Sequence, residues 1–384
     1  MGNDLVVCER DNDLEIVIDG QTETFQSQAN NLKSIIVQAY RGYVTMSAIN
    51  WLTAHSISMS MLDVRGQIKS SINPRSTPAG LLNVQQLRIH EDRKERLKLA
   101  IQLIEDKVRS QLEFLNDLSK YYPVDAHSID DIQVSRSNRL KTLQDVMLYE
   151  AQIAKAYWCE MAKVINLIAP ELKFNGRDTR DSNGRNAGNV VNASLNYLYA
   201  VLEHQVRASL FAHGFDVTIG IVHESMPGKQ PLVYDVIEQF RYIADMTVID
   251  MLSAHQLRKN DFKLQPNYVM TSKPETAKKL IDKMQYNLSR KVKINGLNNS
   301  MWTVIDRQCV ALKDYYLSGK KIPSISTLPL EKNMTMKIKE WISSVSVSEA
   351  RELGIGKSTL WYLKHRDQNK VYGKVYEKIR ESID

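Results

Sequence analysis

The sequence predicts an α+β protein with a small N-terminal β domain, a large all-α domain and a C-terminal helix-turn-helix. Short apolar runs separated by turn residues occupy the first 66 residues. Apolar residues at helical spacing follow from residue 87, and a helix-turn-helix pattern begins near residue 346. The predicted boundaries are 1–75, 76–325 and 340–384.

Composition narrows the class of protein. The chain has 384 residues, 43% of them hydrophobic, and a formal net charge of +7, which favours a polyanionic partner such as nucleic acid or an anionic membrane. Its three cysteines, Cys8, Cys159 and Cys309, lie far apart, which argues against a disulfide framework and a thiolate zinc site. We see no signal-peptide core and no apolar run long enough to span a membrane, so we expect a reduced, cytoplasmic setting.

The N-terminal strands are expected at three apolar runs. These are Leu5–Val7, Leu14–Ile18 and Ser56–Leu62, and Asp, Asn and Gly turn residues separate the early ones. The polar stretch 67–80 contains Pro74, Pro78 and several serines, which is typical of a linker.

The helical domain is expected to contain six helices. Their predicted ranges are 87–118, 139–168, 188–213, 233–257, 273–289 and 300–318. The polar loop 175–185 contains three arginines, and it is either a solvated loop or a segment that orders on phosphate.

A group of metal-binding side chains lies within a short stretch of the α domain. His223 follows an apolar, strand-like run, and Asp235, Glu238 and Arg241 share one face if their segment is a helix. Each residue alone has an ordinary explanation as a buried histidine or a solvated acid. Together they could hold a divalent ion, because carboxylate oxygens suit Mg²⁺ and an added imidazole also suits Mn²⁺.

Glu150 is a candidate third acid. It lies in the largely apolar and aromatic run 148–158. A carboxylate in such surroundings is costly unless it is paired or bound to a metal.

Several segments, in order and at suitable spacing, resemble the CRISPR-associated spacer-acquisition integrase family. The similarity covers about residues 4–320. The segments that carry it are 149–151, 192–203, 212–215, 219–223 and 232–241.

The resemblance implies a site that joins DNA 3′-hydroxyl ends to a target duplex by transesterification, with nicking when water is the nucleophile. Glu150, His223 and Glu238 would be the ligands of Mg²⁺ or Mn²⁺, and Asp235 would assist or share coordination. Arg241 would either orient these acids or contact DNA. The resemblance also implies a homodimer formed through the β domain, with a tetramer on DNA as the alternative assembly, in the nucleoid of a prokaryotic cytoplasm.

Basic residues suggest where DNA would lie. The segment 258–293 has ten lysines and arginines against three acids, so a DNA backbone track is expected there, although a solvated helix face would have the same composition. The residues considered for DNA contact in the α domain are Lys229, Arg241, Arg258 and Lys259; Lys229 could equally be an exposed turn residue.

The C-terminal segment 346–364 has the helix-turn-helix arrangement. Ala350 is expected where the helices cross and Gly354 at the turn, with Leu353, Ile355, Leu360 and Leu363 as the shared core. The residues expected to face DNA are Lys357, Ser358, Thr359, Trp361, Tyr362 and Lys364. A small helical packing module is the alternative.

This extension favours one branch of the family. The casposases, integrases of self-synthesising transposons, resemble the chain in having an added C-terminal helix-turn-helix. The alternative is a CRISPR-adaptation integrase that acts with a small ferredoxin-like partner, and a third possibility is a non-catalytic DNA-binding protein that retains the fold.

Overall fold

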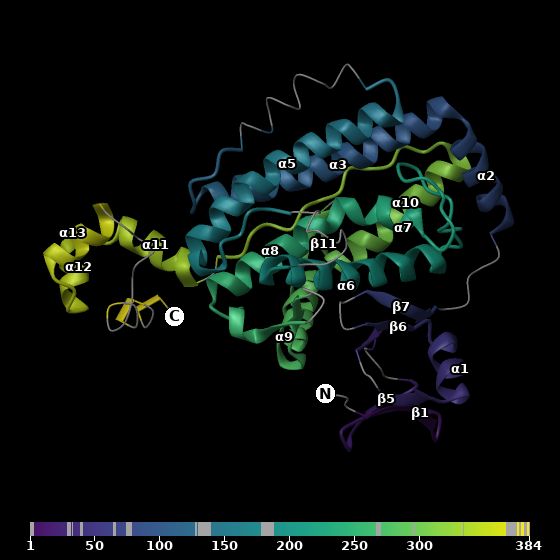
Figure 1. Ribbon diagram of the computed structural model, residues 1–384, viewed down its shortest axis with the longest axis horizontal. Helices are drawn as coiled ribbons and strands as arrows, with labels where there is room; N and C mark the ends of the chain where they lie inside the picture. Colours follow the sequence, from purple (N-terminus) through teal and green to yellow (C-terminus); the bar gives the residue numbers. More distant parts are fainter. Residues whose placement is uncertain are drawn as a thin grey trace.

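The computed structural model combines a β-rich N-terminal region, a larger helical region and a short C-terminal group of helices (Figure 1). This confirms the predicted α+β class. The described residues are 4–28, 32, 34–38, 41–63, 67–73, 79–126, 129, 140–177, 188–265, 270–294, 296–332, 334–365, 375, 378–379 and 382–383. Most of the loop predicted at 175–185 lies outside them.

Two small sheets and one helix form the N-terminal region. The first sheet has the order β3-β2-β1-β5, in which β5 runs parallel to β1, and the second has the order β4-β6-β7. The elements are β1 (Asp4–Arg10), β2 (Asp13–Ile18), β3 (Gln21–Phe25), β4 (Ser34–Val37), β5 (Arg41–Val44), α1 (Met46–Ala54), β6 (Ser58–Leu62) and β7 (Ile68–Ile72).

Tight turns fix the register of the first three strands. Asp11 and Asn12 have φ of 53° and 70°, and Asp19 and Gly20 have φ of 51° and 81°. Two-residue hairpin loops favour positive φ at both positions, which Asn, Asp and Gly tolerate. The resulting register places Val7 and Leu14 in one apolar cluster with Trp51 of α1.

Part of this region differs from the prediction. The linker expected at 67–80 is wrong in its first half, because β7 occupies Ile68–Ile72 and pairs with β6. The three central residues of β7 are exposed, so the strand lacks the apolar alternation that would have predicted it. The helix α1 was not predicted either.

The helical region surrounds one buried helix, α8. Every residue of α8 from Tyr242 to Ser253 is buried, as expected for a helix that is enclosed on all sides. The elements are α2 (Gly80–Glu91), α3 (Arg93–Ser119), α5 (Leu143–Ile168), η1 (Pro170–Leu172), α6 (Val190–Ala212), α7 (Pro231–Ile237), η2 (Glu238–Phe240), α8 (Arg241–Ser253), η3 (Lys259–Asp261), β8 (Phe262–Leu264), β9 (Met270–Ser272), α9 (Pro274–Ser289), β10 (Lys291–Ile294), β11 (Leu297–Ser300) and α10 (Met301–Ser318).

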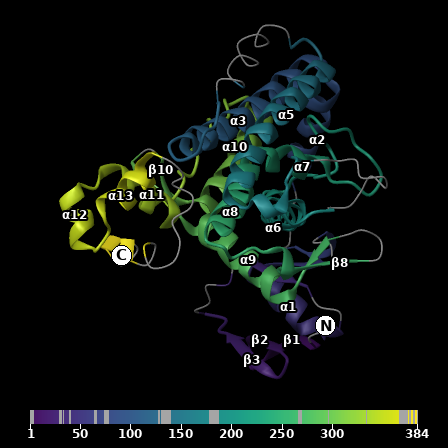
Figure 2. The same ribbon diagram turned by 60° about the vertical axis from the view of Figure 1, so that its left-hand side comes forward.

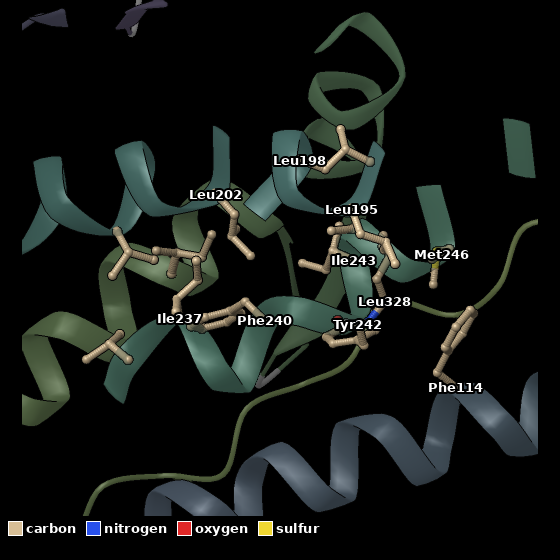
Figure 3. Packing of buried hydrophobic residues seen from close by; sticks show 14 of the residues in the cluster. Phe114, Leu195, Leu198, Leu202, Ile237, Phe240, Tyr242, Ile243, Met246 and Leu328 are labelled. Carbon is tan, nitrogen blue, oxygen red and sulfur yellow. Dashed lines mark hydrogen bonds between the residues drawn. The ribbon is translucent and has the colours of Figure 1, made fainter. Parts of the chain in front are cut away.

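Figure 3 shows how α8 and η2 pack. Leu195, Leu198 and Leu202 of α6 lie above Phe240, Tyr242 and Ile243, and Phe114 of α3 approaches from the other side. The core of this region therefore joins α3, α6 and α8, the first and last of which also carry charged residues of the candidate site.

The predicted helices at 139–168, 188–213, 273–289 and 300–318 are confirmed to within a few residues at each end. The prediction of one helix at 87–118 is wrong. The chain instead forms α2 and α3, separated at Asp92, whose carboxylate accepts hydrogen bonds from the backbone N–H groups of Lys94 and Glu95 and so begins α3. The predicted helix at 233–257 is also interrupted, by the 3₁₀ turn η2.

An extended strap, residues 319–332, connects α10 to the C-terminal helices (Figure 1). Side chains of α3 and α8 hold its backbone: Gln102 Nε2 donates to the carbonyl of Ile322 at 2.7 Å, and the backbone N–H of Leu328 donates to the Tyr242 hydroxyl at 2.7 Å. The strap thus belongs to the packed helical region.

The helices α11 (Met334–Ser344), α12 (Val347–Glu352) and α13 (Lys357–His365) lie to one side of the helical region in both views (Figures 1 and 2). They have a separate apolar cluster that includes Ala350, Ile355, Leu360 and Leu363. Gly354, in the turn between α12 and α13, has φ of 68°. None of the helices in the described part of the chain has the length and apolar character that a membrane span requires.

A buried histidine connects the N-terminal region to the helical region. His204 of α6 is 1% exposed, and its ring nitrogens lie 3.2 Å from the Ser58 hydroxyl and 2.5 Å from the Ser60 hydroxyl, both on β6. Burial, aided by the charge of Arg207, lowers the pKa of His204 from 6.5 to about 4. The imidazole is therefore neutral in the folded protein at neutral pH.

We predict that His204 makes stability sensitive to acid. The pKa of His204 is about 4 in the folded protein, whereas an unperturbed histidine has a pKa of 6.5. Its contribution to stability is therefore complete above pH 6.5 and is lost as the pH falls towards 4. Between pH 7 and about pH 4.5 the wild type should lose about 2 to 3 kcal/mol more unfolding free energy than His204→Gln. Denaturant titrations of both proteins at the two pH values measure this, and equal losses would contradict it.

Candidate active site

A buried ion cluster lies where α3, α5 and η2 meet. The ammonium group of Lys107, on α3, pairs with Glu150 Oε1 of α5, and its Nζ lies 2.6 Å from Glu238 Oε2 of η2. The other oxygen of Glu238 lies 2.8 Å from Nη2 of Arg241, at the start of α8. Glu150 and Glu238, both candidates from the sequence, are therefore brought together by a lysine that sequence analysis missed.

The sequence contains a signal for Lys107. It lies on the buried face of α3 with Leu103, Ile104 and Val108, at spacings of four, three and one residues. A lysine within the apolar stripe of a long helix needs a buried counter-charge. Two carboxylates supply it here.

The cluster controls the charge of Glu238. Burial raises the pKa of this carboxyl, but Arg241 and Lys107 outweigh burial and hold its pKa at about 2. Burial also disfavours the charged form of Lys107 and so lowers its pKa, but the charges of Glu238 and Glu150 outweigh burial and raise this pKa overall. Both groups are therefore ionised at neutral pH.

His223 lies in the irregular segment 219–224, which is not the strand suggested by its apolar residues. Asp235 of α7 holds this segment from behind: its carboxylate accepts hydrogen bonds from the backbone N–H groups of Ile221, Val222 and His223. It also lies 2.7 Å from Nδ1 of the His223 ring. This hydrogen bond raises the pKa of His223, and the charges of Glu238 and Glu150 contribute to raising it.

The contact with Asp235 determines which ring nitrogen of His223 is free. When Nδ1 donates to Asp235, the neutral imidazole carries its lone pair on Nε2. The His223 side chain is 42% exposed, whereas the Asp235 side chain is fully buried. Asp235 therefore lies behind the imidazole with both oxygens engaged, which favours a positioning role over metal coordination.

Two residues of the α2–α3 segment hold the other side of the His223 segment. His90 Nδ1 donates to the carbonyl of Gly220 at 2.8 Å, and Arg96 Nε donates to the carbonyl of Ile221 at 2.8 Å. A Cβ at Gly220 would lie 2.2 Å from the carbonyl oxygen of His223 and 2.7 Å from Cβ of Pro231. Glycine is thus required for this close packing.

Glu150, Glu238 and His223 are the side chains that could bind a divalent cation. In the described part of the chain, no three His, Cys, Asp or Glu side chains meet closely enough to hold a metal ion as they stand. The chemistry of the donors nevertheless fits: Glu150, Glu238 and Nε2 of His223 form an oxygen and nitrogen set suited to Mg²⁺ or Mn²⁺. The ammonium of Lys107 lies between the two carboxylates.

The candidate DNA-contacting residues lie at several places. Lys229, Arg258 and Lys259 are exposed. Arg241 is engaged with Glu238, and its guanidinium lies 4.8 Å from the ring centre of Tyr199. On α13 the residues Lys357, Ser358, Thr359, Trp361 and Tyr362 are exposed.

Lys364 has a structural contact, because its Nζ donates to the carbonyl of Val345 at 2.7 Å. Two members of the basic segment 258–293 are likewise engaged: Lys283 pairs with Asp250, and Arg290 donates to the carbonyl of Pro329. The exposed members of that segment on β8, α9 and β10 are Lys263, Lys278, Lys279, Lys291 and Lys293.

The chain matches a CRISPR-associated protein family along most of its length. The family model described as CRISPR associated protein Cas1 matches residues 2–286. The chain therefore belongs to the Cas1 family, as the resemblance in its sequence indicated.

Relatives support this assignment. The chain is 26% identical over 280 residues to CRISPR-associated endonuclease Cas1 1 of Francisella tularensis subsp. novicida, an alignment that covers 71% of this chain and 79% of the relative. It is 25% identical over 247 residues to CRISPR-associated endonuclease Cas1 1 of Chlorobaculum tepidum, covering 62% of this chain and 68% of that one.

Solved structures agree with the fold. A casposase bound to its integration product matches with a TM-score of 0.77 and 25% identity, covering 91% of this chain and 96% of that chain. A Cas1 protein from Thermotoga maritima matches with a TM-score of 0.72 and 14% identity, covering 85% of this chain and 98% of that chain.

We predict that Gly220→Ala displaces the His223 segment. The added Cβ would collide with backbone and proline atoms, so the variant should lose about 1 to 3 kcal/mol of unfolding free energy. Gly80→Ala is the matched control, because a Cβ there meets nothing within 4 Å. Thermal unfolding compares the two variants, and equal midpoints would show that the segment accommodates a side chain.

Proposed function

We propose that this protein is a metal-dependent DNA integrase that joins donor 3′-hydroxyl ends to target duplex DNA by transesterification, with associated endonuclease activity. The observation that carries the proposal is the meeting of Glu150 and Glu238, from separate helices, at one ammonium group, with His223 near enough for their charges to help raise its pKa. Membership of the Cas1 family supports action on nucleic acid.

The chain's own residues would prepare the site. Glu150, Glu238 and Nε2 of His223 would hold Mg²⁺ or Mn²⁺, which when bound would polarise the scissile phosphate and favour ionisation of the attacking hydroxyl. Asp235 keeps the imidazole oriented, and Arg241 keeps Glu238 ionised. The reaction exchanges one phosphodiester for another, so it needs no high-energy cofactor.

The exposed lysines of β8, α9 and β10 would contact the DNA backbone. Phosphate contacts of this kind position the duplex and carry no sequence information. Lys229, Arg258 and Lys259 are exposed and fit the same role. Arg241 would take part only while remaining paired with Glu238.

The C-terminal helices favour the casposase branch in this proposal. Helices α12 and α13 meet at the turn of Gly354, and α13 exposes Ser358, Thr359 and Tyr362, the side chains expected on a recognition helix. A casposase bound to an integration product has a similar fold over 91% of this chain. The second candidate is CRISPR adaptation, part of antiviral defence, with a small ferredoxin-like partner. A chain of a Cas6-RT-Cas1–Cas2 complex has a similar fold, with a TM-score of 0.65.

We further propose a homodimer, with a tetramer on DNA, in the prokaryotic cytoplasm. Tyr43 on the edge strand β5 is 63% exposed, and Met46 on α1 is 72% exposed. Exposed apolar side chains beside an unpaired strand edge favour self-association of the N-terminal region.

We predict that Glu150→Gln and His223→Ala each lower the rate of strand joining by about 100-fold or more, because each removes a ligand whose metal contributes several kcal/mol to phosphoryl transfer. Purified protein, short donor and target duplexes and Mg²⁺ or Mn²⁺ suffice for the measurement. Glu171→Gln, an exposed acid of η1, is the control and should join DNA at the wild-type rate.

Unchanged joining by both site variants would rule out this site. Joining by the protein alone, dependent on particular donor ends, supports the casposase branch, whereas a strict requirement for a second protein supports CRISPR adaptation.

In the same assay Tyr362→Ala should reduce discrimination between DNA sequences while leaving joining intact. Unaltered discrimination would exclude α13 as the helix that recognises the DNA sequence.

A further inference from the structure

Lys107 occupies the position that a cation bound by both acids would need. Its Nζ lies 2.6 Å from Glu238 Oε2 and is in contact with Glu150 Oε1 as well. A divalent ion shared by these oxygens would lie roughly 2.0 to 2.6 Å from each. The ammonium and the ion therefore cannot take this place together.

The balance of charge in the cluster also indicates that Lys107 and a divalent ion would not be present between the carboxylates together. Two carboxylates, Glu150 and Glu238, face two cations, Lys107 and Arg241, so the buried group is balanced without a metal. An added divalent ion would leave two excess positive charges in a region where the Lys107 side chain is only 7% exposed. Excess buried charge of this size is strongly unfavourable.

The contact of Lys107 with Glu238 is suited to exchange. Glu238 Oε2 lies 2.6 Å from the ammonium, and the described residues place no other cation within ion-pair distance of this oxygen. Arg241 holds the other oxygen, so Glu238 keeps one charge partner when Lys107 leaves. The Glu150 side chain, which is 28% exposed, is the partner of Lys107 that lies nearer to solvent.

We propose that Lys107 is a resident counter-cation of this site: it keeps the two carboxylates together before metal binds, and the metal displaces it from between them. The inference rests on the proposed metal-dependent function and deepens it. Lys107 is thus a positioning residue that stabilises the metal-free site and weakens metal affinity by competition.

The test compares the wild-type protein with Lys107→Met and with Lys163→Met, using Mn²⁺ as the probe. Lys163 is the matched control because it pairs with the buried Glu160 outside the cluster, at 2.6 Å. Without metal, Lys107→Met should unfold at a lower temperature than wild type. It should bind Mn²⁺ roughly tenfold more tightly or better, since a competing positive charge is gone, and Mn²⁺ should raise its unfolding temperature more than that of the other two proteins.

A second measurement uses only the wild type, so the inference stays testable if Lys107→Met fails to fold. An amine-acylating reagent followed by peptide mass spectrometry reports the reactivity of Lys107 with and without Mn²⁺. Displacement should increase its labelling several-fold, while labelling of Lys163 stays constant.

The outcomes separate the two proposals. Equal Mn²⁺ affinity in Lys107→Met and wild type, or Lys107 labelling that Mn²⁺ leaves unchanged, overturns the counter-cation role while metal binding itself stands. Absence of Mn²⁺ binding by the wild type overturns the metal-dependent function, and the inference with it.

Discussion

Two carboxylates from different helices can both stay ionised close together inside a protein when a cation lies between them, and this constraint governs the site. Glu150 on α5 and Glu238 on η2 both contact Lys107 of α3. Like charges at such range would otherwise force one acid to take up a proton. Glu238 keeps a low pKa because two basic side chains, Arg241 and Lys107, lie beside it.

The backbone around the cluster is arranged to meet the same constraint. The chain leaves regular α-helix at Glu238–Phe240, directly where the acid turns towards α3, and returns to it at Arg241. On the opposite side the segment of His223 has no regular secondary structure, and Asp235, His90 and Arg96 satisfy its backbone groups. Irregular backbone is stable in this interior because side chains replace the missing ladder of hydrogen bonds.

Sequence patterns predicted the parts of this arrangement that depend on local chemistry. The α+β class followed from the change of apolar period, and most helices followed from the spacing of apolar residues. Glu150 was singled out as an acid in apolar surroundings, and it does have a buried partner. The identity of that partner was missed, although a lysine in the apolar stripe of α3 was a visible signal.

Other features depended on tertiary contacts and could not be predicted in this way. No proline or glycine marks the interruption at Glu238, so the pattern favoured one uninterrupted helix. Asp235 looked like a metal ligand because only the folded chain shows three backbone N–H groups directed at its carboxylate. The strand β7 has an exposed polar centre, and only its pairing with β6 distinguishes it from a linker.

The central claim is that these side chains form one cation-binding centre in which a metal takes the place of an ammonium group. Diffraction from crystals soaked in Mn²⁺, recorded at the manganese absorption edge, tests it most directly. We expect one anomalous peak bounded by Glu150, Glu238 and Nε2 of His223, with Lys107 turned away from it. A peak elsewhere, or none, with Lys107 still between the two carboxylates, would contradict the claim.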